Sequence, residues 1–245
     1  MNIIYFAGGN RVETLRYIVQ SRDFTVTQIY ITSIESNLSL YQDFAKENDI
    51  PLTIANKKNL LELFTYKNEE VLLSVGYRFI IPKAIFSIPS YAINIHPSLL
   101  PKYKGAYSGF AIITNREKET GLTAHFLDEG VDTGDIIHQK KINLTLSDSI
   151  ASMSERLIEI EPTFVLETLL MLKNGCYRRL EQKLIADEEV FNNKRIPEDS
   201  KIDPSLALID LIDKIRACDA ERFPAYFIID DVRVKIKLEF EKNSV

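Results

Sequence analysis

The chain has 245 residues, of which 45% are hydrophobic and 27% charged, and this composition is typical of a soluble globular protein. Its formal net charge of -5 argues against nucleic acid as the main partner, because a phosphate backbone favours basic surfaces. No segment approaches the roughly 20 apolar residues of a membrane helix, and the N-terminus lacks the basic start of a signal peptide, so we expect a cytoplasmic protein with no membrane partner.

The first half of the chain alternates apolar runs with helical patterns. Residues 2–6 form a run that ends at Gly8 and Gly9, and apolar positions at helical spacing follow from Asn10, which predicts a strand, a turn and a helix. Further strands are predicted at 25–32, 51–54, 71–75 and 91–95, and further helices at 39–48, 59–64 and 82–86. This alternation predicts an α/β domain, a Rossmann-like fold with a mostly parallel sheet.

Three segments fall at or just after the ends of predicted strands. They are residues 8–9, residues 76–78 and residues 94–96. Ligands of parallel α/β sheets bind beyond the carboxyl ends of the strands. The three segments therefore predict one binding edge.

The second half predicts a helix at 106–115, strands at 122–127 and 135–142, and a long helix at 147–172. From Lys173 the chain becomes more polar, up to Asp203, and a helix at 206–217 and a hairpin pattern at 226–240 around Asp230 and Asp231 follow. We therefore predict a catalytic domain at 1–180 and a small α+β appendage at 181–245. The apolar hairpin is a candidate contact for a homodimer.

Asn94, His96 and Asp132 are the candidate catalytic residues. Asn94 and His96 lie two apart on a predicted strand, so their side chains share one face, and Asp132 lies in a loop between Gly130 and Gly134. An imidazole exchanges protons near pH 7, and a neighbouring carboxylate raises its pKa and orients it. Such a set suits the attack of an amine on an acyl carbon. The amide and imidazole would stabilise an oxyanion, while the imidazole and carboxylate would relay the proton.

Each of these residues also has a purely structural explanation. An asparagine at a strand end commonly caps a turn, a single histidine is commonly structural, and an aspartate beside glycines commonly makes a turn. The two cysteines, Cys176 and Cys218, have no metal-ligand spacing, so we expect reduced thiols and no metal. Only a resemblance raises the catalytic interpretation of the set above the structural one.

Residues 94–107 and 121–137 read NIHPSLLPKYKGAY and GLTAHFLDEGVDTGDII, and both closely resemble the signature of the folate-dependent formyltransferases. That family includes glycinamide ribonucleotide transformylase, methionyl-tRNA formyltransferase and the sugar-nucleotide N-formyltransferases. The resemblance implies an enzyme that moves the formyl group of 10-formyltetrahydrofolate, its co-substrate, directly to an amine. It implies that Asn94, His96 and Asp132 are catalytic. It also suggests that the pterin contacts Arg78, Phe79, Ile80, Asp128, Gly130 and Val131.

Features outside these two segments bear on the acceptor. Methionyl-tRNA formyltransferases carry a larger, basic C-terminal domain, whereas only about 65 residues of this acidic chain follow position 180. Glycinamide ribonucleotide transformylase holds a phosphate at a Gly-Ser-Asn type loop after its first strand. Gly8, Gly9, Asn10 and Arg11 stand there, and a helix N-terminus can still bind an anion, so this alternative stays open. A catalytically inactive folate- or nucleotide-binding relative is the remaining alternative.

Residues 194–203, 215–217 and 223–227 resemble the C-terminal part of sugar-nucleotide N-formyltransferases. The leading prediction is an N-formyltransferase for a dTDP- or UDP-linked 3-amino or 4-amino dideoxyhexose, in the synthesis of O-antigen lipopolysaccharide or another surface glycan. The residues expected to contact or orient this acceptor are Tyr103, Lys104, Tyr107, His125 and Arg195. Packing roles stay open for the tyrosines and Lys104, as does a structural ion pair for Arg195.

Overall fold

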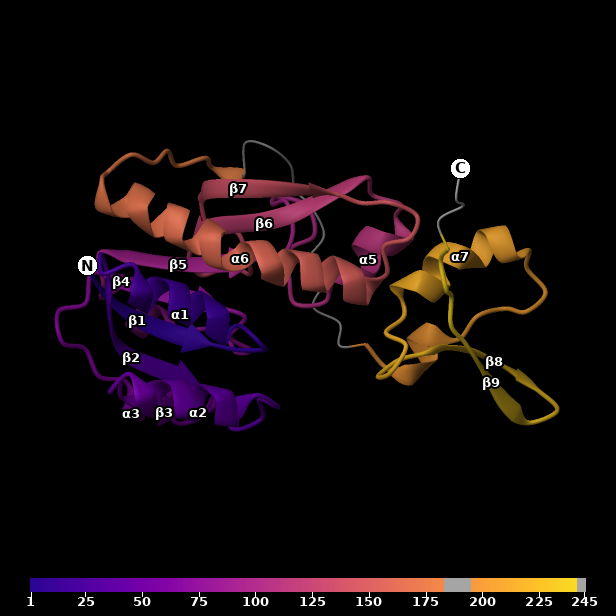
Figure 1. The fold of residues 1–245 in the computed structure, drawn as a ribbon, viewed down its shortest axis with the longest axis horizontal. Helices are drawn as coiled ribbons and strands as arrows, with labels where there is room; N and C mark the ends of the chain where they lie inside the picture. Colours follow the sequence, from indigo (N-terminus) through magenta and orange to yellow (C-terminus); the bar gives the residue numbers. More distant parts are fainter. Residues whose placement is uncertain (183–194, 242–245) are drawn as a thin grey trace.

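The structure is a computed structural model that describes residues 1–182 and 195–241 (Figure 1). Lys194, where the C-terminal segment of resemblance begins, lies outside the described residues. The strands are β1 (Asn2–Ala7), β2 (Thr25–Ile31), β3 (Leu52–Ile54), β4 (Val71–Val75), β5 (Tyr91–His96), β6 (Glu119–Phe126), β7 (Ile136–Asn143), β8 (Ala225–Ile229) and β9 (Val232–Ile236). The helices are α1 (Val12–Gln20), α2 (Leu38–Glu47), α3 (Leu60–Leu63), α4 (Lys83–Phe86), α5 (Ser108–Thr114), α6 (Ile150–Lys173), the 3₁₀ helix η2 (Pro197–Ser200) and α7 (Leu208–Ala217).

The main sheet has seven strands in the order β3-β2-β1-β4-β5-β6-β7. Strands β1 to β5 pair in parallel, whereas β6 and β7 pair antiparallel to their neighbours. This arrangement confirms the predicted Rossmann-like, mostly parallel sheet. The carboxyl ends of β1, β4 and β5 lie at one edge, so the three segments predicted at strand ends do meet there.

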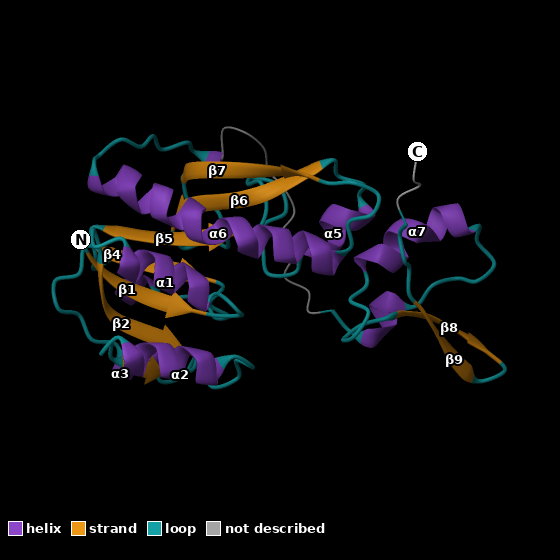
Figure 2. Ribbon diagram, viewed as in Figure 1, coloured by secondary structure: helices purple, strands orange, loops and turns teal. Residues whose placement is uncertain are grey.

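Helices cover both faces of this sheet (Figure 2). Along β1 the buried side chains alternate: Ile3, Tyr5 and Ala7 pack with α1, α2, α5 and α6, whereas Ile4 and Phe6 pack with α3 and α4. A strand buried on both sides needs apolar residues at every position. Strands β1 and β4, which are apolar except for Asn2 and the buried Ser74, therefore form the centre of the core.

The C-terminal part lies at one end of the molecule and has a small core of its own (Figure 1). The buried members of this core are Ile202, Leu211, Ile215, Cys218 and Ala225. Strands β8 and β9 form the predicted antiparallel hairpin, and Asp230 and Asp231 have φ values of 45° and 63° at its turn. Two-residue hairpin turns require such positive φ angles, and aspartate tolerates them.

Buried polar contacts join α7 to the main domain. Asp213 is bonded to Arg116, which precedes β6, and also accepts from Arg216 at 2.8 Å. Arg216 is 6% exposed and donates to the Asp148 carbonyl at 2.7 Å. One carboxylate therefore pairs with two arginines at this junction. Across the residues described here, no helix is long and apolar enough to cross a membrane.

Candidate active site

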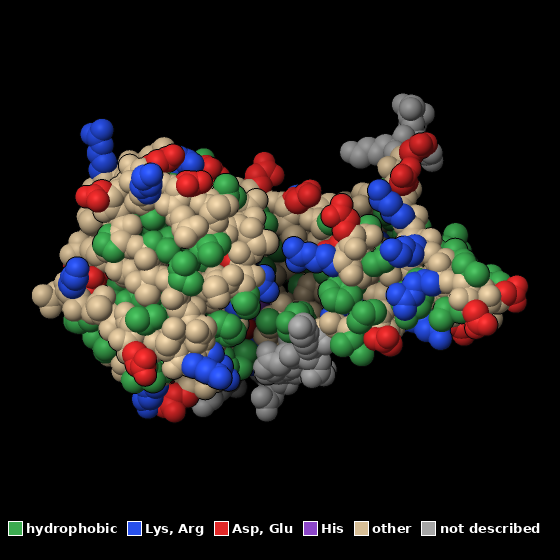
Figure 3. Space-filling view, turned by 90° about the horizontal axis from the view of Figure 1, so that it is seen from below, with side chains coloured by type: hydrophobic (Ala, Val, Ile, Leu, Met, Phe, Trp, Pro, Cys, Tyr) green, Lys and Arg blue, Asp and Glu red, His purple; other side chains and the backbone are tan. Residues whose placement is uncertain are grey.

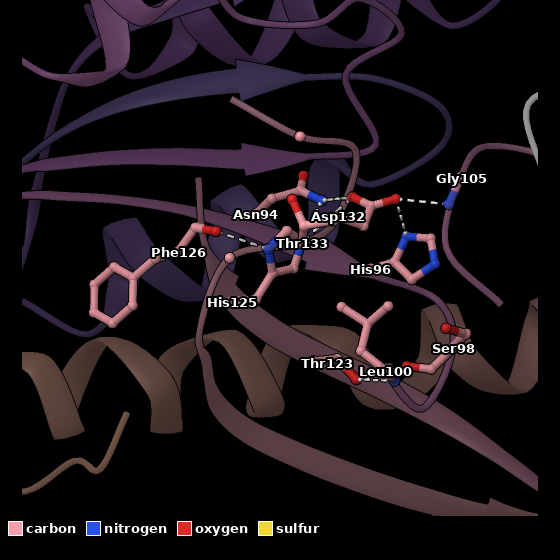
Figure 4. Close-up of polar contacts among 12 residues, drawn as sticks. Asn94, His96, Ser98, Leu100, Gly105, Thr123, His125, Phe126, Asp132 and Thr133 are labelled. Carbon is pink, nitrogen blue, oxygen red and sulfur yellow. Dashed lines mark hydrogen bonds and ion pairs between the residues drawn. The ribbon is translucent and has the colours of Figure 1, made fainter. Parts of the chain in front are cut away.

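Asn94, His96 and Asp132 converge at the end of β5 (Figure 4). The side chains of Asn94 and His96 point to the same side of the strand, as expected for residues two apart. Asp132 Oδ1 accepts a hydrogen bond from Asn94 Nδ2 at 3.3 Å, and its Oδ2 lies 3.3 Å from His96 Nδ1. The structure therefore brings the three candidate catalytic side chains into one group.

Asp132 is held as a carboxylate by its surroundings. Its Oδ2 accepts from the backbone N–H of Gly105 at 2.8 Å, and its backbone is left-handed, with φ of 53°. Burial opposes ionisation, but the imidazoles of His96 and His125 and the Gly105 amide outweigh it and hold the pKa of Asp132 well below its usual range. Asp132 is therefore ionised at neutral pH.

His96 is almost fully buried between two acceptors. Its Nε2 lies 2.8 Å from the carbonyl oxygen of Tyr103, which can only accept, so Nε2 carries a hydrogen. Burial lowers the pKa of His96, while Asp132 and the Tyr103 carbonyl act in the opposite direction. The Nδ1 atom faces Asp132, so a proton taken up there is shared with the carboxylate. The pair is thus arranged as a proton acceptor.

His125 completes the group from β6. It lies opposite Asn94 in the antiparallel register of β5 and β6, and it is 1% exposed. Its Nδ1 donates to the Phe126 carbonyl at 2.8 Å, so in the neutral ring Nε2 accepts from Asn94 Nδ2 at 3.2 Å. Both amide hydrogens of Asn94 are thus directed at His125 and Asp132. For Asn94 to donate to an oxyanion, as the sequence led us to expect, one of these bonds must be exchanged.

The loop after His96 is anchored to β6. Thr123 Oγ1 donates to the Ser98 carbonyl at 2.6 Å and accepts from the Leu100 N–H at 3.1 Å (Figure 4). Ser98 itself donates to the Lys102 carbonyl at 2.8 Å. These bonds fix the loop that carries the Tyr103 carbonyl to His96.

The residues expected near the pterin lie at the same edge of the sheet. Ile80 is 73% exposed, and in the described chain no backbone–backbone hydrogen bond involves Arg78, Phe79, Ile80 or Val131. Asp128 Oδ1 accepts from the N–H of Gly130 at 3.0 Å and so shapes the loop before Asp132. Within residues 1–182 and 195–241, the backbone groups of residues 78–80 and 131 therefore have no backbone partner.

A cavity of about 210 Å³ lies next to the loop that follows the candidate catalytic residue His96. Pro97, the residue after His96, lines it together with Tyr107 and Phe110 of the following segment. Two arginines, Arg11 from the start of α1 and Arg195 from the C-terminal part, also line it. The cavity therefore combines two arginines with aromatic surface.

Arg195 is held with its charge uncompensated by any described carboxylate. Its guanidinium lies 4.1 Å from the ring centre of Phe110 and 5.4 Å from that of Phe223, and Nη2 donates to Ser200 Oγ at 2.7 Å. Its buried Nε has no hydrogen-bond partner among the described residues.

Arg11 forms an ion pair with Glu161, an acidic residue that the sequence did not single out. Arg11 Nη1 donates to Glu161 Oε2 of α6 at 3.0 Å, and Thr14 donates to Glu161 Oε1 at 2.7 Å. Burial raises the pKa of Glu161, against the opposing effect of Arg11. The buried Nε of Arg11 also lacks a partner within the part of the chain that is described. No local pattern could reveal a pair separated by 150 positions.

The remaining candidate acceptor residues differ in accessibility. Tyr107 is 38% exposed and lines the cavity, whereas Lys104 is 5% exposed. Tyr103 is 8% exposed, and its hydroxyl donates to Glu117 at 2.7 Å, so its ring is held within the fold. Arg78, in turn, pairs with the buried Glu35 at 2.5 Å, and Glu35 also accepts from the Gly9 N–H at 3.1 Å. In residues 1–182 and 195–241 no group of three metal-ligating side chains is arranged to hold a metal.

Comparison with known families agrees with the sequence signature. The family model described as formyl transferase matches residues 33–169, more than half of the chain. The chain belongs to the formyl transferase family. It is 35% identical over 156 residues to a methionyl-tRNA formyltransferase of Methylacidiphilum infernorum, an alignment that covers 63% of this chain and 46% of that protein. This chain thus spans about half the length of that curated relative.

Solved structures resemble the fold of this formyl transferase over nearly its whole length. A 4-N formyltransferase from Francisella tularensis superposes with a TM-score of 0.82 at 21% identity and covers 98% of both chains. An N-formyltransferase from Helicobacter canadensis, in complex with folinic acid and dTDP-3-aminofucose, has a TM-score of 0.74 at 21% identity and covers 95% of this chain and 85% of that one. These likenesses extend through the C-terminal part and establish the shared fold.

Proposed function

We propose that the protein is an N-formyltransferase that moves the formyl group of 10-formyltetrahydrofolate to the amine of a nucleotide-linked amino sugar. The observation that carries this proposal is that two features of the structure lie next to each other. A buried group of Asn94, His96 and Asp132 lies next to a cavity lined by Arg11 and Arg195. The first suits acyl transfer to an amine, and the second suits an acceptor with phosphates.

The folate co-substrate fits the edge formed by the β4–α4 loop and the loop before Asp132. Arg78, Phe79, Ile80 and Val131 have unused backbone groups there, which are able to pair with the edge of a pterin, and exposed Ile80 offers apolar surface for its rings. Bound 10-formyltetrahydrofolate would supply the formyl group. Asp128 and Gly130 hold the neighbouring turn in shape.

In the proposed reaction the acceptor amine would attack the formyl carbon, the bond from that carbon to N10 of the folate would break, and the proton lost by the amine would pass to N10, so that tetrahydrofolate is released. The chain would carry that proton and stabilise the formyl oxygen. His96 and Asp132 share the proton that leaves the amine, because Nδ1 of His96 faces Oδ2 of Asp132. Asn94 Nδ2 exchanges one of its present partners for the formyl oxygen as negative charge develops there. His125 orients Asn94, and its Nε2 also lies 3.3 Å from Oδ1 of the Asp132 carboxylate.

Three observations favour a sugar nucleotide as acceptor. Two arginines in one cavity suit a diphosphate, and the Tyr107 and Phe110 rings suit a sugar or base. The net charge of -5 disfavours a tRNA surface. The Helicobacter canadensis protein, similar over both parts of the chain, was solved with dTDP-3-aminofucose. We therefore propose a dTDP- or UDP-linked 3-amino or 4-amino dideoxyhexose, destined for O-antigen lipopolysaccharide or another surface glycan.

The main alternative acceptor is methionyl-tRNA, because a curated relative that is 35% identical over 156 residues is a methionyl-tRNA formyltransferase. That similarity covers 46% of the relative, so it concerns the formyl-transfer chemistry more than the recognition of tRNA. Glycinamide ribonucleotide is a second alternative acceptor, because its single phosphate would suit the turn formed by residues 8–11.

We also propose that residues 1–180 form the catalytic domain, that residues 181–245 help to bind the acceptor, and that the enzyme acts as a cytoplasmic homodimer. The hairpin supports the dimer, because Ile228, Ile229, Val232 and Val234 on it are exposed. Figure 3 shows hydrophobic side chains on the surface of the C-terminal part, among basic and acidic ones. Apolar surface on a two-stranded hairpin is costly in water and favours burial against a second copy.

A panel assay tests the proposed function. The protein is incubated with 10-formyltetrahydrofolate and, in separate reactions, dTDP- and UDP-linked amino sugars, glycinamide ribonucleotide and methionyl-tRNA, and products are identified by mass spectrometry. The expected result is formylation of a sugar nucleotide alone. Formylation of methionyl-tRNA or glycinamide ribonucleotide instead would replace the proposed acceptor, and no formylation in any reaction would overturn the proposed activity.

A further inference from the structure

Gln182 is a buried side chain that clamps the backbone of the Asp132 loop. It is 2% exposed, and its Nε2 donates to the carbonyl of Asp132 at 2.9 Å and to that of Gly134 at 2.7 Å. Both partners are carbonyl oxygens, which only accept, so the amide nitrogen must occupy this position. One NH₂ group therefore bridges two carbonyls on either side of Thr133.

The backbone that Gln182 holds is an unfavourable one. Asp132 has φ of 53°, a left-handed conformation in which the Cβ of an L-residue crowds the neighbouring carbonyl oxygen. The direction of the Asp132 carboxylate depends on this backbone, because both oxygens must reach partners on other segments. Asp128 supports the loop from the opposite side, where its Oδ1 accepts from Thr133 Oγ1 at 2.7 Å and from the Gly130 N–H at 3.0 Å.

The segment that delivers Gln182 is itself fixed to the sheet. Leu180 exchanges two backbone hydrogen bonds with Ile136 of β7, at 2.9 and 3.0 Å. Arg179 pairs with Asp135 at 3.1 Å, and its guanidinium lies 4.1 Å from the ring centre of Phe126. Gln182 is therefore placed by neighbours on both sides of the catalytic loop, which distinguishes it from a side chain that merely fills space.

We propose that Gln182 is a positioning residue for formyl transfer, which acts by holding the Asp132 backbone so that the carboxylate stays aligned with His96. The inference rests on the proposed function for its kinetic consequence. Its structural consequence, the placement of Asp132 against His96, is measurable without any turnover. A misplacement of about 1 Å at a reacting group can cost on the order of a hundredfold in rate.

Two substitutions at position 182 test this role. Gln182→Met keeps the length of the side chain but removes the donor, and we expect kcat to fall about 10- to 100-fold while KM for the acceptor changes less than threefold. Gln182→Glu puts a carboxylate oxygen against the two carbonyls, and we expect a larger loss. The pH–rate profile of Gln182→Met should also shift, since the proton acceptor is displaced.

Gln28 provides the matched control. It is a buried glutamine, 8% exposed, whose Nε2 donates to the Ile29 carbonyl at 3.1 Å and to Thr53 Oγ1 at 3.0 Å, on strands β2 and β3 away from Asp132. Gln28→Met and Gln182→Met should lower the midpoint of thermal unfolding to a similar extent. Only Gln28→Met should leave kcat and the pH–rate profile unchanged. Equal kinetic effects of the two substitutions, or a Gln182→Met enzyme with wild-type kcat, would overturn the proposal.

A measurement that needs no activity separates this inference from the proposed function. In ¹⁵N NMR of the imidazoles, the His96 signal, assigned through His96→Asn, should move in Gln182→Met and stay in place in Gln28→Met. If the wild-type protein transfers no formyl group but the His96 signal moves, the proposed function fails and the positioning role stands. If transfer occurs and neither the signal nor kcat responds at position 182, the positioning role fails alone.

Discussion

Arg195 offers the sharpest test of the acceptor cavity, because its guanidinium is held ready for an anion. Phe110 and Phe223 stack against it, Ser200 accepts from Nη2, and Nε lacks a partner among the described residues. The side chain is thus oriented in advance, so little conformational entropy opposes the binding of a phosphate. Removal of Arg195 should weaken the acceptor complex more than it slows the transfer step.

The expected rise in KM follows from the loss of a charge-assisted hydrogen bond to the acceptor. Charge-assisted hydrogen bonds contribute about 1.5–3 kcal/mol, and each 1.4 kcal/mol is a factor of ten, so Arg195→Ala should raise KM for the sugar nucleotide about 10- to 150-fold. Arg195→Lys keeps the charge but loses the planar stacking and the second donor, so its effect should be smaller, about tenfold. The value of kcat should stay within a few-fold for both.

The assay is steady-state formyl transfer at saturating 10-formyltetrahydrofolate with the sugar nucleotide varied. Arg222→Ala is the control, because Arg222 is an exposed arginine of the same C-terminal part that lies outside the cavity. An unchanged KM in Arg195→Ala, or a fall in kcat at unchanged KM, would refute the assignment of this cavity to the phosphates.

Three further predictions concern stability and assembly. The depressed pKa of Asp132 stabilises the fold only while the carboxylate is ionised, so this contribution is lost as the pH falls below about 4. In urea unfolding, the free energy of unfolding of Asp132→Asn should therefore decrease less between neutral and acid pH than that of wild type. An equal decrease in both proteins would contradict this prediction. Asp213→Ala leaves Arg116 and Arg216 without their carboxylate and should lower the free energy of unfolding, measured in urea, by about 3 kcal/mol. An unchanged urea midpoint would show that these contacts do not stabilise the fold. Val232→Asp on the exposed hairpin should convert the proposed dimer into a monomer by light scattering, and a mass equal to that of wild type would exclude the hairpin as the contact.

Local patterns in the sequence predicted the order of elements well. The short apolar runs of β1 and β4 are buried on both faces, and a strand of that kind has few other interpretations. The period of two along β5 correctly put Asn94 and His96 on one side. The start of β6 was predicted three residues late, because Glu119, Thr120 and Gly121 look polar and become a strand only by pairing with β7.

The rest of the site depends on contacts between distant segments. The pairing of Asn94 with His125 follows from the antiparallel register of β5 and β6, which no local pattern specifies. Glu161 supports Arg11 from the middle of α6, and Gln182 reaches the Asp132 loop from beyond that helix. These are ordinary residue types in ordinary local surroundings. Their roles arise only when the chain is folded.

The rate of formyl transfer by Asp132→Asn is the most direct test of the central claim that Asn94, His96 and Asp132 carry out the reaction. The amide has nearly the same shape but cannot take up the proton that His96 and Asp132 share. With an unchanged circular dichroism spectrum and saturating substrates, kcat should fall about a hundred- to ten-thousandfold. A folded Asp132→Asn enzyme that turns over as fast as wild type would contradict the account.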